Sequence, residues 1–159
     1  MKICTGKGDR GFSSLADGNA LPKNSPCFEL MGDIDELSCV LGLAKTAGGD
    51  LSFLEESQKA LSKIMSYIAC ENEKYLMNEA EADIPLAHAD YDFEEFILPG
   101  KTELSARLDF ARAVCRRAER KYTTFYLEKK ADKNALMFLN RLSDALYILA
   151  RRAESQGEK

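Results

Sequence analysis

The sequence is poor in the residues that build metal and nucleophilic sites. Its 159 residues include one histidine, no tryptophan and five scattered cysteines without a C-x-x-C pair. Zinc sites need several histidines or cysteines at short spacing, and di-iron bundles need two Glu-x-x-His pairs, so both kinds of centre are excluded. The single His88 lies in an expected loop and is interpreted as a surface residue. Its sequence context does not point to Cys–His nucleophilic catalysis.

Charge and hydropathy exclude further classes of protein. The net charge is −4, whereas proteins that depend on nucleic-acid binding usually carry a basic surplus. No apolar run approaches the roughly 18 residues of a membrane-spanning helix. The N-terminal segment MKICTGKGDRG has no apolar core of the kind found in signal peptides. We therefore expect a cytoplasmic protein without nucleic-acid or membrane partners, whose cysteines stay reduced.

An irregular N-terminal segment is expected to precede a helical bundle. The length predicts a single domain, 1–159. Residues 1–30 are rich in glycine and proline, which predicts an ordered loop or short strands, and the bundle is expected over 31–159. From about Asp33, apolar residues recur at helical spacing as far as Gly48. Acidic residues at the start of this helix favour its dipole, which explains them without any functional role.

Three further long helices are expected. The second begins after Asp50 and reaches about Glu79. The third begins at about Thr102, a residue suited to an N-cap, and the fourth is capped by Asp132. Long amphipathic helices joined by short links predict an all-α, antiparallel bundle.

The two C-terminal helices carry polar residues between the apolar ones. Arg112, Arg116 and Arg120 recur every four residues, which keeps them on one slowly drifting helical stripe. Asn140 and Asp144 have the same spacing on the next helix. A row of guanidiniums facing an amide and a carboxylate can hold a polyphosphate, because arginine offers a rigid donor fork that matches phosphate oxygens. A solvated helix face is the alternative interpretation.

The N-terminal loop has the composition of an anion-binding turn. The segment TGKGDRGFSS, from Thr5 to Ser14, holds three glycines, a lysine and several hydroxyl groups, and Lys23 follows in the same irregular region. Glycines allow backbone N–H groups to turn toward an anion, and a lysine adds positive charge. The segment is not a Walker A motif, which needs G-x-x-x-x-G-K-[ST] between a strand and a helix. By itself the loop is a weak signal, and a plain turn is the simpler interpretation.

Taken together, these segments resemble one family. The loop TGKGDRGFSSL, the helix segment MGDIDEL, the link FILPG, and the blocks RRAER and FLNRLSD occur here in the order found in PduO-type ATP:cob(I)alamin adenosyltransferases. The resemblance covers nearly the whole chain, and the pairing of RRAER with NRLSD is its most specific part. It implies a five-helix bundle with an irregular N-terminal nucleotide-binding segment, assembled as a homotrimer. It also implies that ATP and the corrinoid meet at sites between neighbouring subunits.

The resemblance implies roles for individual residues. Asp35 and Arg112 match the interhelical ion pair of the family beside the active site, and Arg116 matches the residue that binds the polyphosphate. Glu119 matches a residue that helps to hold the nucleotide and its Mg²⁺. Phe96 matches the aromatic residue that crowds the lower face of the corrin. The positions that match ATP-binding residues are Thr5, Lys7, Gly8, Asp9, Gly11, Ser13, Lys23, Arg116, Glu119 and Asn140.

The implied chemistry agrees with the lack of a catalytic triad. Cob(I)alamin is itself a strong nucleophile that attacks C5′ of ATP and expels triphosphate, giving adenosylcobalamin. The protein then has to position the reactants and neutralise charge on the leaving group. Removal of the lower axial ligand makes the reduction of cob(II)alamin easier, and an apolar wedge such as Phe96 can displace that ligand. A reductase and an adenosylcobalamin-dependent enzyme are the expected protein partners.

The chain departs from the pattern of the family at several positions. The family usually reads T-K-T-G-D or T-R-T-G-D, whereas this loop reads Thr5-Gly6-Lys7-Gly8-Asp9, so that the basic residue stands one place later. Ser38 replaces a common asparagine, and the glutamine often found after the equivalent of Ile64 is missing. These departures leave an alternative open, in which the chain binds ATP or adenosylcobalamin with little or no turnover.

Overall fold

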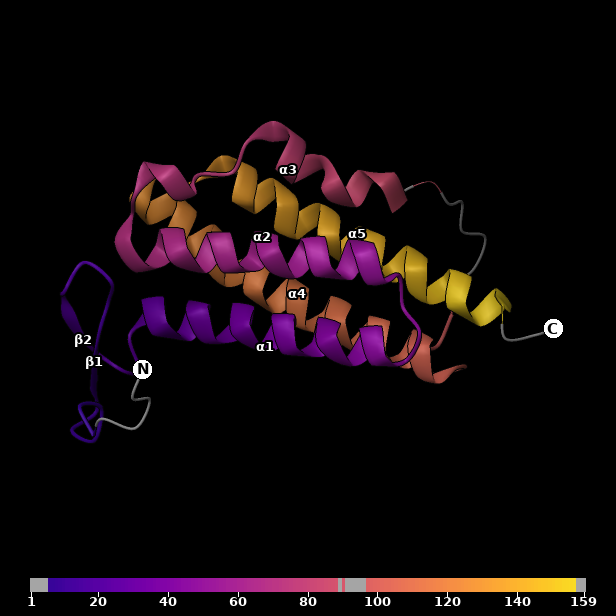
Figure 1. The fold of residues 1–159 in the computed structure, drawn as a ribbon, viewed down its shortest axis with the longest axis horizontal. Coiled ribbons are helices and arrows are strands. Elements are labelled where there is room, and N and C mark those ends of the chain that lie inside the picture. The colour runs from indigo at the N-terminus through magenta and orange to yellow at the C-terminus, as the bar shows by residue number, and fades with distance from the viewer. Residues whose placement is uncertain (1–5, 89, 91–96, 157–159) are drawn as a thin grey trace.

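A bundle of long helices makes up most of the computed structural model, which describes residues 6–88, 90 and 97–156 (Figure 1). The described residues form five α-helices and one two-stranded antiparallel sheet, so the expected all-α fold is confirmed. The elements, in chain order, are β1 (Phe12–Ser14), β2 (Ala20–Pro22), α1 (Pro26–Thr46), α2 (Leu51–Cys70), α3 (Glu79–Asp83), α4 (Glu103–Lys129) and α5 (Lys133–Gln156). Short 3₁₀ turns, Glu73–Tyr75 and Ile84–His88, flank α3.

Helix α1 begins earlier than the sequence pattern predicts. It starts at Pro26 and not near Asp33, so the irregular segment is shorter than the expected 1–30. Proline suits the first turn of a helix, because its fixed φ is helical and its missing N–H would have no partner there. The acid in the first turn is Glu29. The interpretation of Asp33 and Asp35 as acids at a helix start is therefore wrong, since both lie well inside α1.

Helix α2 ends earlier than predicted. Asp50 caps its start, because the side chain accepts a hydrogen bond from the Phe53 N–H. The helix stops at Cys70, where Glu71 takes a left-handed φ of 48°, and does not continue to Glu79. Asn72 and Asn78 then cap the following 3₁₀ turn and α3 with their side chains. These local caps compete with helix continuation and explain the error.

Helices α4 and α5 begin where the sequence predicts. Thr102 and Ser105 form a reciprocal cap at the start of α4. Asp132 accepts a hydrogen bond from the Asn134 N–H at the start of α5. Its other carboxylate oxygen accepts from the Met77 N–H at 2.7 Å, which ties the segment before α3 to this helix start.

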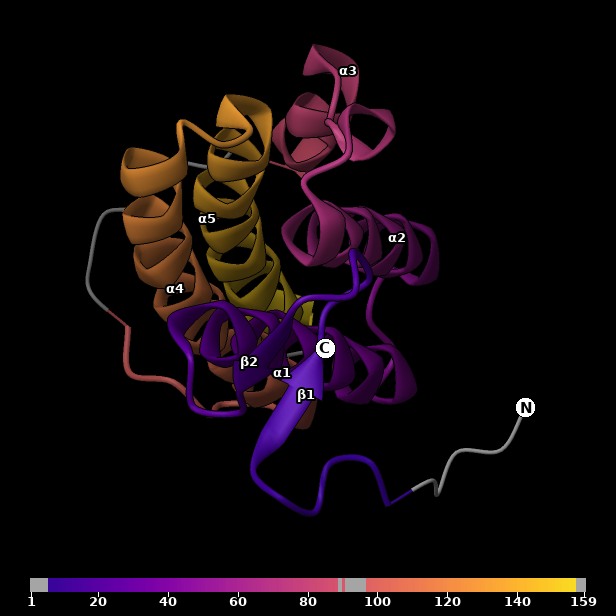
Figure 2. The same ribbon diagram turned by 90° about the vertical axis from the view of Figure 1, so that its left-hand side faces the viewer.

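The core lies between α1, α2, α4 and α5. Viewed along the bundle, α4 and α2 lie on opposite sides of α5, α1 lies below and α3 above (Figure 2). The packed neighbours include α4 with α5, α1 with α4, and α1 with α2. Fully buried side chains from all four long helices fill the centre, among them Leu37, Leu41, Leu61, Ile64, Val114, Cys115, Phe138, Leu139 and Leu142.

The strands form a small hairpin outside the bundle, near the start of α1 (Figures 1 and 2). They pair antiparallel, with Ser13 opposite Leu21, which agrees with the prediction of short strands. The hairpin is tied to the end of α2 by a hydrogen bond from the Ala16 N–H to the Ala69 carbonyl at 3.1 Å. This bond anchors the turn between the two strands, whereas the glycine loop lies before β1 and is tied to the segment after β2 by the Lys23 N–H, which bonds to the Gly11 carbonyl at 2.9 Å.

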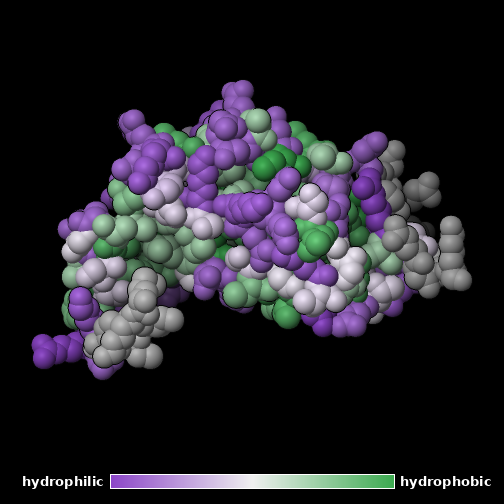
Figure 3. Space-filling view, viewed as in Figure 1, coloured by the Kyte–Doolittle hydropathy of each residue, from purple (hydrophilic) through white to green (hydrophobic). Residues whose placement is uncertain are grey.

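The surface of the described residues is mixed. Hydrophilic side chains cover much of the face in Figure 3, with apolar areas between them. None of the helices described is long and apolar enough to span a membrane. Cys39 is exposed on α1, whereas Cys115 is buried in α4. His88 is half-buried with its ring centroid 4.3 Å from that of Phe53, so the expected surface histidine packs against a core aromatic residue.

Candidate functional site

The glycine loop has a conformation that requires its glycines. Gly6 and Gly11 take φ values of +70° and +79°, which residues with a Cβ rarely adopt. The Asp9 N–H bonds to the Gly6 carbonyl, and the Gly11 N–H bonds to the Gly8 carbonyl, both at 3.2 Å. A Cβ at Gly8 would lie 2.6 Å from Nζ of Lys23. The structure therefore places the Lys23 ammonium directly against the loop, as an anion-binding role requires.

A shallow hollow follows the loop into the hairpin. It encloses about 400 Å³ and is lined by Lys7, Gly8, Phe12, Ser13, Ser14 and Ala20. Lys7 offers a charged donor, and the two serines offer hydroxyl donors. Of the loop residues predicted from the sequence, Thr5 lies outside the described residues. The others are mostly exposed, so the loop presents its donors to solvent.

A second group of predicted residues gathers where α4 packs on α5. The buried Cys115 thiol donates a hydrogen bond to the Leu139 carbonyl at 3.3 Å, which fixes the register of the two helices. The next residue on each helix, Arg116 and Asn140, is exposed. Glu119 is half-buried one turn beyond Cys115. Arg116, Glu119 and Asn140 thus belong to the stretch of the two helices that meets at the Cys115–Leu139 bond.

The pKa of the Cys115 thiol depends on charged side chains of the same group. Burial raises the pKa of this thiol far above its usual range. The charge of Glu119 acts in the same direction, Arg116 acts against it, and Asp144 raises the pKa further. These three charged side chains therefore surround a thiol that stays protonated. Cys115 is a packing residue in this arrangement and not a nucleophile.

Arg112 lies one turn before Arg116 on α4, against an aromatic ring. Its guanidinium carbon is 5.1 Å from the centroid of Tyr147 on α5. The guanidinium of Arg151 is 5.0 Å from the same centroid. Arg151 is 1% exposed and forms ion pairs with Asp109 and Glu154, both nearly buried. Burial raises the pKa of the Asp109 carboxyl, and the nearby Arg151 acts in the opposite direction.

Asp35 and Arg112 do not meet within one chain. Asp35 is exposed on α1, and no ion pair between described residues joins it to Arg112. Other acids of α1, close to Asp35 in the sequence, contact α4 instead. Asp33 lies 3.0 Å from Nζ of Lys121 and 3.3 Å from Nε of Arg117.

Further acids extend this charged contact between α1 and α4. Glu36 pairs with Arg117, and Glu29 lies 3.2 Å from Nζ of Lys121. The hydrogen bond from Lys121 to Asp33 raises the pKa of the lysine. Sequence analysis missed these residues. A signal was present, because Glu29 with Asp33 and Arg117 with Lys121 both have the four-residue spacing that forms one helical stripe.

The loop and the α4–α5 group remain separate within one chain. No hydrogen bond or ion pair between described residues joins the loop segment 6–14 to Arg116, Glu119 or Asn140. Figure 1 shows the hairpin beyond the start of α1, outside the helix bundle. Phe96, the predicted corrin-facing residue, lies outside the described residues. Each half of the predicted site is therefore assembled locally, and the two halves are not joined.

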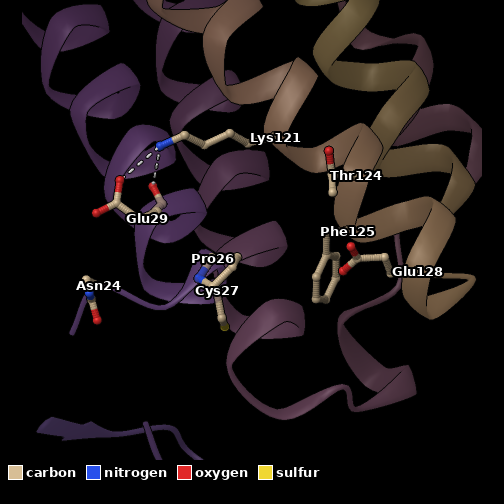
Figure 4. A pocket seen from close by; sticks show the side chains of 8 residues that line it. All are labelled: Asn24, Pro26, Cys27, Glu29, Lys121, Thr124, Phe125 and Glu128. Carbon is tan, nitrogen blue, oxygen red and sulfur yellow. Dashed lines mark hydrogen bonds and ion pairs between the residues drawn. The ribbon is translucent and has the colours of Figure 1, made fainter. Parts of the chain in front are cut away.

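A hollow between α1 and α4 lies apart from both halves (Figure 4). It encloses about 300 Å³, and its lining residues are Asn24, Pro26, Cys27, Glu29, Lys121, Thr124, Phe125 and Glu128. None of them is a predicted site residue. The Lys121 ammonium points toward Glu29, with which it is already paired. The chemistry expected of this chain therefore does not map to this hollow.

The sequence and the fold match known proteins. Residues 3–153 match the family described as Cobalamin adenosyltransferase. The chain is 35% identical over 173 residues to the corrinoid adenosyltransferase PduO of Salmonella typhimurium, which covers all of this chain but only 52% of that protein. It is 38% identical over 172 residues to the corrinoid adenosyltransferase MMAB of Homo sapiens, covering 96% of this chain and 68% of the relative. The chain thus spans about half the length of the Salmonella protein.

Solved structures agree with this match. A variant of the PduO-type ATP:corrinoid adenosyltransferase from Lactobacillus reuteri, complexed with cobalamin and ATP, superposes with a TM-score of 0.86 at 27% identity, covering 99% of this chain and 93% of that one. A second variant, complexed with ATP, gives a TM-score of 0.85 at 29% identity, with 98% and 96% coverage. The predicted five-helix architecture and the resemblance stated from the sequence are both confirmed. This chain belongs to the cobalamin adenosyltransferase family.

Proposed function

We propose that this chain is an ATP:cob(I)alamin adenosyltransferase. In the proposed reaction the electron pair on cobalt forms a bond to C5′ of ATP, the C5′–O bond breaks, and triphosphate leaves with that bonding pair. The observation that carries the proposal is the α4–α5 group, in which the hydrogen bond from Cys115 to Leu139 joins the two helices at the residues that directly precede the exposed Arg116 and Asn140. Relatives over nearly the whole chain are named corrinoid adenosyltransferases, which supports it.

The proposed roles of the site residues follow from charge. Arg116 binds the polyphosphate, because a guanidinium offers several aligned donors to phosphate oxygens. Lys23 and the loop residues Lys7 and Ser13 contact the same phosphates from the other half of the site. These contacts neutralise the charge that builds up on triphosphate as it leaves, which is the main electrostatic task of such an enzyme.

Magnesium binding is proposed at Glu119. Mg²⁺ is commonly held by one or two carboxylates together with substrate phosphates. The half-buried Glu119 fits this pattern, with Arg116 and Asp144 also close to Cys115. No group of three or more metal-ligating side chains occurs among residues 6–88, 90 and 97–156, so the nucleotide has to supply the remaining ligands. The ion would offset phosphate charge and fix the conformation of the triphosphate.

We also propose a homotrimer with its sites between subunits. The support is the separation of the glycine loop from Arg116 and Asn140 within one chain. A neighbouring subunit that places its loop on this helix pair would complete the site. Asp35 and Arg112 would likewise pair across the interface, and Phe96 would face the lower side of the corrin. Light scattering tests the assembly, and a monomer with full activity would contradict it.

The cellular setting is part of the proposal. Each described cysteine, namely Cys27, Cys39, Cys70 and Cys115, is a free thiol, which suits the reducing cytoplasm. There the enzyme would receive electrons from a reductase and deliver its product to an adenosylcobalamin-dependent enzyme.

One observation favours a second candidate, a protein that binds ATP or adenosylcobalamin with little turnover. The family commonly has a basic residue where this chain has Gly6, and the left-handed φ of Gly6 disfavours any residue with a Cβ. The loop therefore has its own conformation here. Its positive charge comes from Lys7 and from Lys23, which approaches Gly8.

A titration with ATP, followed by an assay with chemically reduced corrinoid, tests the function. We expect saturable ATP binding and the spectral change that accompanies formation of the cobalt–carbon bond. Saturation without product would support the binding protein. Neither binding nor product would contradict both candidates.

A further inference from the structure

The side chain of Arg112 lies against one aromatic ring. None of the hydrogen bonds or ion pairs between described residues involves its guanidinium, whose contact is with the ring of Tyr147 at 5.1 Å. A guanidinium over an aromatic face is attracted by the ring quadrupole, and its N–H groups then point outward from the edge of the group. Arg112 is half-buried, so this contact restricts the side chain while leaving the N–H edge available.

The ring of Tyr147 also contacts a second, buried guanidinium. Arg151, four residues later on α5, lies 5.0 Å from the ring centroid. Arg151 is 1% exposed and is locked by Asp109 from α4, by Glu154 from α5, and by the Ile97 carbonyl at 3.4 Å. The Tyr147 ring therefore contacts two guanidiniums, one fixed by buried ion pairs and one, that of Arg112, whose contact among the described residues is the ring alone.

Charge balance explains why this arrangement is stable. Two guanidiniums, Arg112 and Arg151, share one ring, and two carboxylates, Asp109 and Glu154, offset them. Burial raises the pKa of the Asp109 carboxyl, and the charge of the half-buried Arg112 acts in the opposite direction, as that of Arg151 does. Asp109 precedes Arg112 by one helical turn, and Tyr147 precedes Arg151 by one turn.

We propose that Tyr147 is a positioning residue that sets the side chain of Arg112 for the transfer reaction. Its ring holds the guanidinium so that the free N–H edge faces an oxygen acceptor of the assembled site. The effect on the transfer reaction rests on the proposed adenosyltransferase function, whereas the contact between Tyr147 and Arg112 does not. The role lies with the ring face and not with the phenol hydroxyl.

The kinetic test compares Tyr147→Phe with Tyr147→Leu in the full chain. Loss of a cation–π contact predicts a decrease in kcat/KM for the reduced corrinoid of roughly 5- to 30-fold in Tyr147→Leu. Tyr147→Phe should stay within about twofold, because its ring keeps the quadrupole. KM for ATP should change in neither variant. An equal loss in both variants, or no loss in either, would overturn the proposal.

Two controls separate positioning from packing. Tyr75→Leu removes a different cation–π contact, in which Nζ of Lys74 lies 4.7 Å from the ring centroid. Tyr75 is far from Arg112 in the sequence, so this substitution should leave the kinetics unchanged. In an Arg112→Met background, Tyr147→Leu should cause no further loss of kcat/KM. A further loss equal to that in the unmodified chain would show that Tyr147 acts independently of Arg112, and would refute its positioning role.

A measurement without turnover keeps the inference separate from the function. In a sample labelled with ¹⁵N-arginine, the Arg112 Nε–H resonance is identified by its disappearance in Arg112→Lys. The ring current of Tyr147 should shift this resonance, with the shift kept in Tyr147→Phe and lost in Tyr147→Leu. If the unmodified protein shows this ring-current shift but has no transferase activity, the proposed function is refuted and the contact between Tyr147 and Arg112 is established. A resonance unaffected by either substitution would overturn the contact.

Discussion

The glycine loop and the α4–α5 helix pair carry the two halves of the proposed site, and they are held in opposite ways. The helix pair is fixed by buried polar contacts, including the Cys115–Leu139 hydrogen bond and the Asp109–Arg151 ion pair. The loop is held by backbone hydrogen bonds and by the approach of Lys23 to Gly8. The backbone that carries Arg116 is therefore fixed by buried contacts, whereas the loop is held by local contacts at the edge of the molecule.

Because of this difference, substitutions that change stability and substitutions that change activity should fall at different positions. A substitution within the buried network of the helix pair should change the free energy of unfolding, because buried groups lose their partners. An exposed substitution on either half should change activity with little effect on unfolding.

Asp109→Ala should have the largest effect on stability. It leaves the guanidinium of Arg151 buried without its main partner, which commonly costs about 3–5 kcal/mol when burial is complete. The matched control is Glu103→Ala on the same helix, whose partner Arg107 is partly exposed and which should cost less than about 1 kcal/mol. Urea unfolding measures both. Equal values for the two variants would show that the buried network does not stabilise the bundle.

Arg116→Ala should have the largest effect on activity. Loss of one charge-assisted contact to the leaving group predicts a decrease in kcat/KM on the order of 100-fold or more. The melting temperature should stay nearly unchanged, because Arg116 is exposed. Arg107→Ala removes another arginine from α4 and should leave the kinetics as they are. If Arg116→Ala kept its kcat/KM for ATP, the proposed role of Arg116 would be wrong.

Gly8→Ala tests the loop at a smaller scale. The added methyl would lie 2.6 Å from Nζ of Lys23, so the flexible ammonium has to move away. We expect KM for ATP to rise about tenfold, equivalent to one charge-assisted hydrogen bond. The free energy of unfolding should change by less than about 0.5 kcal/mol, as for other surface substitutions. In a Lys23→Ala background the effect on KM should largely disappear, and an undiminished effect would contradict the proposed contact.

The double-mutant cycle of Asp35→Asn and Arg112→Met tests whether α1 and α4 meet at these two residues in the assembled protein. The two residues are not paired within a chain, so a coupling energy can arise only if a neighbouring subunit or a bound ligand brings them together. For residues in contact, a coupling of roughly 0.5–3 kcal/mol is expected in kcat/KM. Additive effects within about 0.5 kcal/mol would show that they do not meet in the assembled enzyme.

The sequence was most informative where local chemistry decides the structure. Thr102 and Asp132 are effective caps before strongly periodic apolar residues, so α4 and α5 were predicted at their true starts. Pro26 was interpreted as part of a turn because proline fits both a loop and a first helical turn. The end of α2 was missed because the asparagines that follow it, Asn72 and Asn78, were not recognised as caps of new helical turns.

Contacts between helices were the least predictable part of the site. Asp33 and Asp35 have the same chemistry and lie two residues apart, yet the rotation of α1 against α4 directs Asp33 to Lys121 and leaves Asp35 exposed. The contact of Arg112 with Tyr147 likewise depends on the register of α4 and α5. Spacing along one helix identifies its stripes, but only packing determines which stripe faces which neighbour.

The exposure of Cys39 gives the chain a chemical reporter of its own. In the described part of the chain, Cys39 is the exposed thiol, whereas Cys27 and Cys70 are half-buried and Cys115 is buried. Cys39 lies one helical turn after Asp35, on the outward face of α1. A thiol-specific reagent should therefore react at Cys39 well before Cys115, and any surface that docks over Asp35 will slow that reaction. The rate of alkylation at one native atom thus becomes a measure of assembly that needs no engineered label.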